Sequence, residues 1–111
     1  MTDSLGLNIQ VPHPARVYDF WLGGKDNFEA DRRAAAEAIE IFPKTVQSAR
    51  SCRDFLSRVV SYLTAEAGIR QFLDLGSGLP SAANVHEVAQ SIAPESWRWR
   101  GCRTVVCARK P

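Results

Sequence analysis

One short segment constrains this chain more than any other, because an apolar strand runs into a turn with two glycines and then into a helix. The strand is predicted over residues 70–75, and the turn is Gly76-Ser77-Gly78. Glycine permits a positive φ and leaves room for a ligand beside the backbone. Ligands of open parallel sheets bind at the carboxyl ends of the strands, and helix N-termini attract anions. The turn can therefore hold a small ligand with a carboxylate or phosphate.

Asp74 lies inside the end of that strand, two residues before the first glycine. A carboxylate there suits a ligand with a cationic or hydrogen-bond-donating part and disfavours a bare diphosphate. A strand followed by Gly-x-Gly is weak evidence by itself, since a plain tight turn between a strand and a helix uses the same residues. Both interpretations stay open at this level.

The first half of the chain predicts helices. Pro14 suits the first turn of a short helix, which Gly23-Gly24 ends. Residues 30–41 are rich in alanine and charge, and they predict a second helix that Pro43 ends. Asp26 can cap this second helix, with an acid three residues further on in the capping-box position.

The second half predicts an α/β arrangement. Apolar residues recur every three or four positions over 46–67, which predicts one long helix, or two stacked end to end, before Gly68. The strand over residues 70–75 is too apolar for a sheet edge and fits a buried parallel strand. A further helix is predicted over about 82–93. Three helices, a strand, a glycine turn and a helix are the opening of an α/β fold.

No good neighbouring strand is predicted after this last helix. Residues 97–101 alternate, but they place arginine where a buried strand favours valine. Residues 103–108 give only weak support for a strand.

Three stretches of the chain, residues 12–28, 65–80 and 84–90, resemble one bacterial family. The first stretch, Pro-His-Pro-Ala-Arg-Val-Tyr-Asp-Phe-Trp-Leu-Gly-Gly-Lys-Asp-Asn-Phe, is unusual and specific. The Asp-Leu-Gly-Ser-Gly turn is similar to motif I of class I methyltransferases that use S-adenosylmethionine (SAM), and Pro80 matches the family's replacement of the third glycine. Over about residues 10–95, the chain thus resembles the S-adenosyl methyltransferases once grouped as a domain of unknown function.

This resemblance implies an α/β fold in which N-terminal helices precede the first strand, turn and helix of a Rossmann-like SAM-binding methyltransferase domain, here truncated. It implies SAM as the cofactor, bound by the motif residues Asp74, Gly76, Ser77 and Gly78.

The resemblance also implies that the segment from Tyr18 to Asn27 folds over the same cleft. Its candidate cofactor-binding residues are Tyr18, Lys25, Asp26 and Asn27. Each has a structural alternative, such as a helix cap for Asp26, a solvated charge for Lys25 and a core position for Tyr18. Asn84 and His86 are further candidates in the helix after the turn, and a surface position is the alternative for both.

The charge distribution changes near Glu95. Residues 1–95 contain nine basic and all twelve acidic side chains, whereas residues 96–111 contain five basic side chains and no acid. We therefore divide the chain into a flexible arm (1–11), the N-terminal part of a methyltransferase domain (12–95) and a divergent basic tail (96–111). Class I methyltransferases place a ribose-binding acid about 20 residues after motif I. This tail provides none.

The composition of the tail suggests a hypothesis. Tryptophan, arginine, glycine and cysteine are the residues that result when a GC-rich gene is read in the wrong frame, and residues 96–111 are rich in them. Translation of the other two reading frames tests this hypothesis, because one of them should continue with a hydrophobic strand and an acid.

We predict a SAM-dependent methyltransferase-family protein with an unknown methyl acceptor. A complete domain needs on the order of 200 residues, so a chain of 111 residues is expected to be inactive alone or to need an oligomer or a partner chain. The alternative is a non-catalytic binding module whose basic tail, with Trp97 and Trp99, contacts nucleic acid or an acidic partner. A disordered tail is the plainer interpretation, so nucleic acid is not the expected partner. A complete small enzyme has no nucleophile–base pair to support it.

The remaining features predict an ordinary cytoplasmic protein. No apolar run approaches the roughly 20 residues of a membrane span, and residues 1–10 lack the features of a signal peptide. The three cysteines have no Cys-x-x-Cys spacing, so we expect free thiols. Neither histidine has metal-ligand spacing to a partner, and no metal site is expected.

Overall fold

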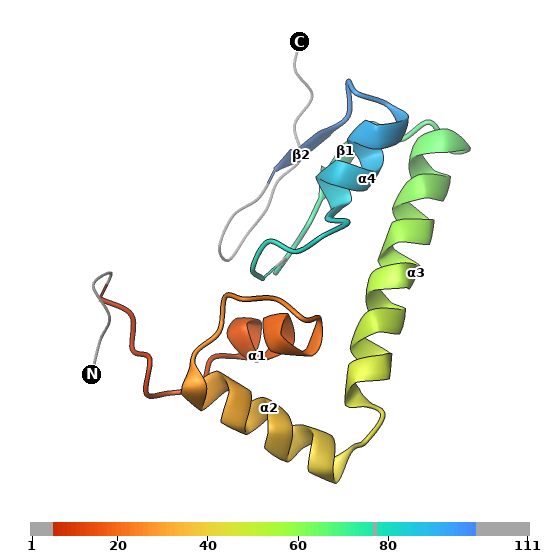
Figure 1. Cartoon of the computed structure of the whole chain (residues 1–111). Coiled ribbons are helices and arrows are strands. Elements are labelled where there is room, and N and C mark those ends of the chain that lie inside the picture. Colours follow the sequence, from red (N-terminus) through yellow and green to blue (C-terminus); the bar gives the residue numbers. More distant parts are fainter. Residues whose placement is uncertain (1–5, 77, 100–111) are drawn as a thin grey trace. The chain divides into compact units, whose positions relative to one another are not determined.

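The computed structural model describes residues 6–76 and 78–99, which belong to two units: unit 1 up to Ser51 and unit 2 from Cys52 onward. Each unit is described by itself. The elements in chain order (Figure 1) are α1 (Pro14–Trp21), α2 (Glu29–Ile41), α3 (Thr45–Ala65), β1 (Gln71–Leu73), α4 (Val85–Ile92) and β2 (Trp97–Trp99). Helix α3 begins in unit 1 and continues into unit 2.

Unit 1 contains α1 and α2, which pack against each other. Pro14 is the first residue of α1, and the Nδ1 atom of His13 accepts a hydrogen bond from the amide of Ala15 at 3.2 Å. Helix α1 ends at Trp21, and Gly23 follows with a φ of +79°. The predicted short helix between the proline and the glycine pair is therefore confirmed.

A carboxylate, Asp31 on α2, lies at the buried centre of unit 1. Its relative exposure is 0%. It accepts hydrogen bonds from the amides of His13 and Phe28 and from Nε of Arg16, each at 2.8 Å. One side chain thus joins the segment before α1, α1 itself and the start of α2.

Arg16 completes this arrangement from α1. Its Nη2 atom donates to the carbonyl oxygens of Asn8 (3.2 Å) and Val11 (2.8 Å), and its guanidinium carbon lies 5.3 Å from the centroid of the Phe28 ring. Burial alone would raise the pKa of Asp31. The hydrogen bonds from Phe28, His13 and Arg16, together with the charge of Arg16, outweigh burial and lower this pKa below its ordinary value of 3.8.

The start of α2 differs from the prediction. The helix begins at Glu29 after Phe28, so the prediction that Asp26 caps it is wrong. The amide of Phe28 donates to Asp31, which is the third residue of the helix and reaches back as the acid of a capping box does. The amide of Asp26 instead donates to Oδ2 of Asp19 at 2.9 Å, which keeps Asp26 in the loop before the helix. The predicted end of α2 before Pro43 is confirmed.

The core of unit 2 is formed by α3, β1 and α4. Its buried residues are Val60, Phe72, Val85 and Ala89, and Leu56, Leu63 and Val88 pack around them. Helix α3 is one continuous element of 21 residues, which decides between the two alternatives that the periodicity allowed. It ends before Gly68, whose φ is +69°, as the sequence predicted.

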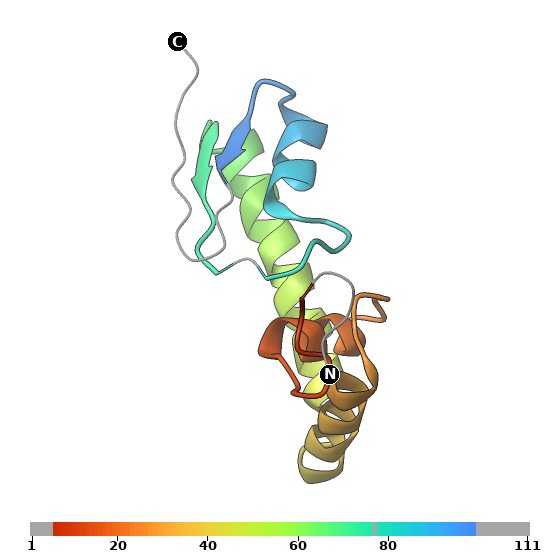
Figure 2. The same cartoon turned by 90° about the vertical axis from the view of Figure 1, so that its left-hand side faces the viewer.

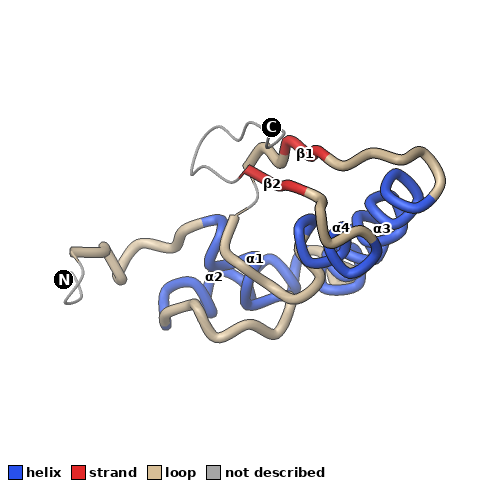
Figure 3. The backbone as a smooth tube through the Cα atoms, turned by 90° about the horizontal axis from the view of Figure 1, so that it is seen from above, coloured by secondary structure: helices blue, strands red, loops and turns tan. Residues whose placement is uncertain are grey.

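The sheet of unit 2 holds two parallel strands, β1 and β2, which lie side by side in Figures 2 and 3. Gln71 pairs with Trp97 and Leu73 with Trp99. The prediction that no good strand follows the last helix is therefore wrong. A parallel ladder is made by backbone groups, so residue preference decides less than how the two strands are aligned.

An ion pair aligns the starts of these strands. Nε of Arg70, which precedes β1, lies 2.8 Å from Oε1 of Glu95, which precedes β2. The backbone amide of Glu95 itself and the guanidinium of Arg70 lower the pKa of this carboxyl below its usual 4.5. The side-chain amide of Gln90 on α4 also donates to the carbonyl of Ser96 at 3.0 Å. These contacts connect the residues that precede the two paired strands and are compatible with their alignment.

The burial of β1 also differs from the prediction. The strand spans Gln71–Leu73, shorter than the predicted 70–75, and only Phe72 is buried. The side chains of Leu73 and Leu75 are 55% and 63% exposed. Phe72 faces α3 and α4, while within the described part of the chain nothing buries the opposite face. The strand is parallel as predicted, but it is buried on one face alone.

None of the helices within the described ranges is both long enough and apolar enough to cross a membrane.

The central place of Asp31 predicts a large effect of a small change. Asp31→Asn should lower the free energy of unfolding by about 3 kcal/mol, because an amide cannot accept from all three donors and Arg16 loses its counter-charge. Urea denaturation followed by circular dichroism measures this loss. Glu37→Gln, the matching change at an exposed position of α2, is the control and should change the value by less than about 0.5 kcal/mol. Equal effects of the two variants would contradict the assignment.

The lowered pKa of Asp31 predicts a pH dependence. A carboxylate whose pKa falls on folding stabilises the folded state above its ordinary pKa, and this contribution is lost as the pH falls through the folded-state pKa. The difference in unfolding free energy between the wild type and Asp31→Asn should be constant between about pH 5 and pH 7 and should shrink below pH 3.8. A difference that persists unchanged at the lowest pH that keeps the wild type folded would refute this linkage.

Candidate functional site

The glycine turn after β1 has the backbone conformation that its sequence suggests. Gly76 and Gly78 have φ values of +66° and +67°, a region that residues with a Cβ rarely adopt. Among the described residues, a Cβ atom built on either glycine would meet nothing within 4 Å. The glycines are therefore needed for conformation and not for packing against the described part of the chain, which leaves the space beside this backbone open. Ser77, the remaining one of the four predicted motif residues, lies outside the described residues.

Asp74 directly follows β1 and is half-buried, while Leu75 and Gly76 after it are exposed. The structure thus brings Asp74, Gly76 and Gly78 together in one turn at the carboxyl end of a parallel strand. A carboxylate in this position can accept hydrogen bonds from an ammonium or hydroxyl group of a ligand. The open backbone beside the two glycines can approach the same ligand closely.

The segment between the turn and α4 contains a strained residue. Ala83 has a φ of +57°, and the left-handed conformation costs a residue with a Cβ about 1–2 kcal/mol. Asn84 after it is buried, and its amide donates to Oε2 of Glu87 at 3.0 Å. Because Ala83 adopts this left-handed conformation, α4 begins at Val85 and not near the predicted residue 82.

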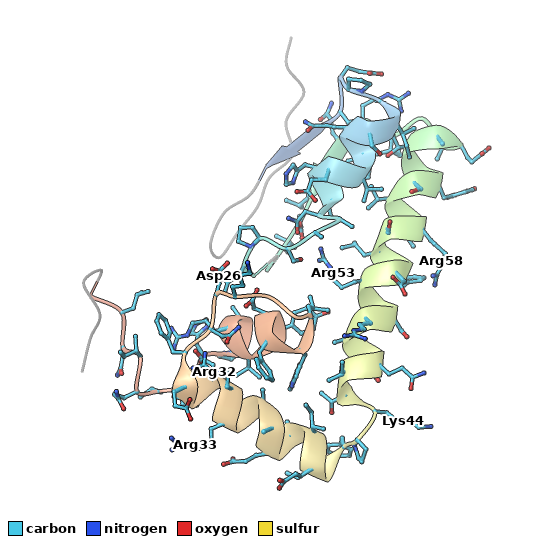
Figure 4. All side chains as sticks on the ribbon, in the orientation of Figure 1. Asp26, Arg32, Arg33, Lys44, Arg53 and Arg58 are labelled. Atoms are coloured by element: carbon cyan, nitrogen blue, oxygen red, sulfur yellow. The ribbon has the colours of Figure 1, made fainter. Side chains whose placement is uncertain are left out.

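Arg53 on α3 holds this segment in place (Figure 4). Its Nη2 atom donates to the carbonyl oxygens of Ala82 (3.0 Å) and Ala83 (3.2 Å) and to Oδ1 of Asn84 (3.1 Å). These contacts join positions about 30 residues apart, and the sequence analysis missed them. Arg53 lies seven residues before the core residue Val60. About two helical turns separate Arg53 from Val60, so Arg53 lies on the apolar face of the helix. An arginine on that face was the sequence signal that could have identified its role.

The two further candidates on α4 differ in their surroundings. The side chain of Asn84 is engaged within the protein, since it accepts from Arg53 and, at 3.5 Å, from the amide of Ser81. His86 is partly buried. Its Nδ1 atom is buried and has no hydrogen-bond partner among the described residues. A buried polar atom of this kind usually pairs with water or a ligand.

The loop after α1 contains the other predicted site residues and is organised by Asp19. This side chain is buried, and its Oδ2 atom accepts hydrogen bonds at 2.9 Å from the amide of Asp26 and from Nδ2 of Asn27. The amide of Gly24 donates to the carbonyl oxygen of Asp19 at 2.8 Å. A Cβ atom on Gly24 would overlap Oδ1 of Asp19, so this glycine is required by close approach.

Lys25 and Asp26 are exposed in this loop, whereas Asn27 is half-buried between Asp19 and Arg32. The hydroxyl of Tyr18 donates to the carbonyl oxygen of Ala49 at 3.3 Å within unit 1. Asp26 and Asn27 are thus held by Asp19 in a fixed loop conformation, and Tyr18 takes part in the packing of its own unit.

The predicted site residues therefore form two groups. Residues 18–27 lie in unit 1, and residues 74–78 lie in unit 2. That the first group covers the second stays a prediction. Most of the basic tail, residues 100–111, lies outside the described residues, and with it four of the five cations on which the alternative of a nucleic-acid-binding module depends.

No metal centre is formed within the described part of the chain, since no three His, Cys, Asp or Glu side chains gather there. Cys52 is an exposed free thiol. The other two cysteines, at positions 102 and 107, fall outside the described residues.

Similarity to known proteins agrees with the resemblance of the motifs. A family model described as S-adenosyl methyltransferase matches residues 2–98. Matching crystal structures include a DUF574 family protein from Streptomyces avermitilis, with 46% identity and a TM-score of 0.77. They also include a Thermobifida fusca protein described as a candidate methyltransferase, with 56% identity and a TM-score of 0.79. No curated protein matches the chain.

The matches cover most of this chain but a minor part of the solved proteins. The alignments include 79% and 82% of this chain, and 34% of each of the two solved chains. The chain thus spans about a third of the length of these structures.

The loop after α1 predicts a steric dependence of Gly24 on Asp19. Gly24→Ala should lower the free energy of unfolding by about 2 kcal/mol, because the new methyl group displaces a buried carboxylate that holds two donors. Urea denaturation measures the change. In an Asp19→Ser background most of this loss should disappear, since the shorter side chain leaves room for the methyl group.

Gly23→Ala, made in the wild-type and the Asp19→Ser backgrounds, is the matched control for Gly24→Ala. Gly23 has a positive φ, but a Cβ there would meet nothing within 4 Å. Its cost should be that of backbone strain, about 1 kcal/mol, and should be the same with and without Asp19. A cost of Gly24→Ala that is independent of Asp19 would contradict the steric interpretation.

Proposed function

This chain belongs to the S-adenosyl methyltransferase family, and on that premise we propose that its glycine turn binds SAM as part of a protein that transfers methyl groups. One observation carries the proposal. Gly76 and Gly78 have the left-handed conformation in a turn that begins two residues after Asp74, at the carboxyl end of β1 and before α4. Open parallel sheets bind their ligands at this place.

The residues of the turn fit the chemical groups of SAM. Bound SAM would supply an electrophilic methyl carbon on its sulfonium: an acceptor nucleophile would bond to this carbon as the carbon–sulfur bond breaks, and the demethylated product would leave as a neutral thioether. The glycines allow the backbone to approach the methionine part without a side chain between them. Asp74 can accept hydrogen bonds from the ammonium group, and the first amides of α4 favour the carboxylate through the partial positive charge of a helix N-terminus. The unpaired Nδ1 atom of His86, on the first turn of α4, offers a further polar contact.

We further propose that unit 2 is the opening part of a Rossmann-like domain. Two parallel strands with a helix between them, β1, α4 and β2, support this proposal. The exposed side chains of Leu73 and Leu75 support an additional layer on the second face of the sheet. The segment from Tyr18 to Asn27 remains our candidate for the cover of the site, with Lys25 and Asp26 as its exposed polar side chains.

The methyl acceptor and the catalytic step belong to the same proposal. In this reaction the protein contributes by holding the donor and the acceptor in line and by excluding water, and not by a nucleophile of its own. We propose that the chain by itself binds SAM but does not turn it over. A partner chain or an oligomer would then complete the acceptor pocket.

Calorimetric titration of the folded chain with SAM and with its demethylated product tests the proposal. Saturable binding is expected, and Gly78→Arg should weaken it at least about tenfold, because the side chain fills the open space beside the turn. Gly68→Arg is the matched control, since Gly68 also has a positive φ with nothing within 4 Å but lies at the end of α3. The affinity of the Gly68→Arg variant for SAM should equal that of the wild type. A folded wild-type chain without measurable binding would reject SAM binding by this chain.

A further inference from the structure

Arg53 makes a contact that neither the motif nor the proposed function uses. All three of its hydrogen bonds to the segment before α4 come from one atom, Nη2, at 3.0 to 3.2 Å. Two acceptors are backbone carbonyl oxygens, of Ala82 and Ala83, and the third is the buried side chain of Asn84. Helix α3 is thereby attached to the short segment that connects the glycine turn to α4.

The end of this segment is restrained at Asn84, whose amide donates to Oε2 of Glu87, but the two residues before Asn84 have no such local contact within the described part of the chain. Ala82 and Ala83 have no side chain that could restrain the backbone, and Ala83 is held at a φ of +57° that alanine does not favour. The side chain of Asn84 takes part in a capping box with Glu87 and accepts a long hydrogen bond, 3.5 Å, from the amide of Ser81. Without Arg53, the segment would be expected to relax toward ordinary φ values.

We propose that Arg53 is a positioning residue for the cofactor site. By holding residues 82–84, it fixes where the chain enters α4, and so where the first amides of α4 and His86 lie relative to the turn at residues 76–78. This inference rests on the proposed function, since it concerns the same site, but it does not place Arg53 in contact with the cofactor. The pre-formed segment lowers the ordering cost of binding.

Substitutions at Arg53 can separate charge, donor number and reach. Arg53→Gln removes the charge and keeps one amide group on a shorter side chain. Arg53→Lys keeps the charge and carries three donors on one nitrogen, which matches a contact made by a single nitrogen of arginine. Lysine should therefore recover part of the function that glutamine loses.

Arg58 provides the control on the same helix. It is exposed, and Figure 4 shows its side chain on a different side of α3 from Arg53. Arg58→Gln removes the same charge and should leave both the segment and the affinity unchanged.

Two measurements on the full chain test the proposal. Hydrogen–deuterium exchange of the amides at residues 81–88 should be at least about tenfold faster in Arg53→Gln than in Arg58→Gln, and intermediate in Arg53→Lys. Titration with SAM should show a loss of affinity of about ten- to hundredfold in Arg53→Gln, with partial recovery in Arg53→Lys. Thermal unfolding of all variants identifies any that have lost the fold.

The two readouts distinguish failure of this inference from failure of the proposed function. Unchanged exchange at residues 81–88 in a folded Arg53→Gln chain would overturn the positioning role, whatever the affinity. Faster exchange with an unchanged SAM affinity would also overturn it, because the segment would then not matter for binding. If the wild type binds no SAM, the proposed function fails, and with it the link from Arg53 to a cofactor, even where exchange shows that Arg53 holds the segment.

Discussion

The loops of this chain depend on charged side chains that hydrogen-bond to backbone groups far away in the sequence. In unit 1, Asp31 is wholly buried and accepts from two amides and from Arg16, which in turn reaches two carbonyl oxygens of the preceding segment. In unit 2, Arg53 binds the segment before α4 in the same manner. The buried apolar residues are mostly small, such as Ala35, Ala49 and Ala89, so packing alone leaves the loops poorly specified. Buried backbone groups need partners, and the charged side chains provide them.

This organisation bears directly on the candidate cofactor site. The turn between Asp74 and Gly78 follows from glycine conformation and is local to the sequence. The start of the helix after it is positioned from elsewhere in unit 2, since Arg53 on α3 binds the segment that precedes α4. In unit 1, Asp19 shapes the loop that carries Lys25 and Asp26. A site of this kind combines a motif that is recognisable by itself with supporting residues that are not, which is the usual division between ligand contacts and the residues that orient them.

Several elements were predictable because single residues mark their ends. Pro14, Pro43 and Gly68 bound the three N-terminal helices, since proline and glycine restrict or extend the allowed backbone conformations. The predictions failed where contacts outside the expected local pattern are made. Strand β2 pairs with β1 although its residues are poor for a buried strand, and Arg70 and Glu95 connect the segments that precede the two strands. Asp26 does not cap α2, because the helix begins at Glu29 and Asp31 reaches back to the amide of Phe28.

The sequence by itself determined the family, the helices and the conformation of the glycine turn, because each depends on residues close together in the chain. Only the tertiary structure decided the start of α4, the pairing of β2, and the burial of Asp19 and Asp31. These features depend on hydrogen bonds between groups that the local sequence pattern does not pair. Removing such groups from water costs free energy, which the hydrogen bonds between them offset, and only the folded chain brings the partners together.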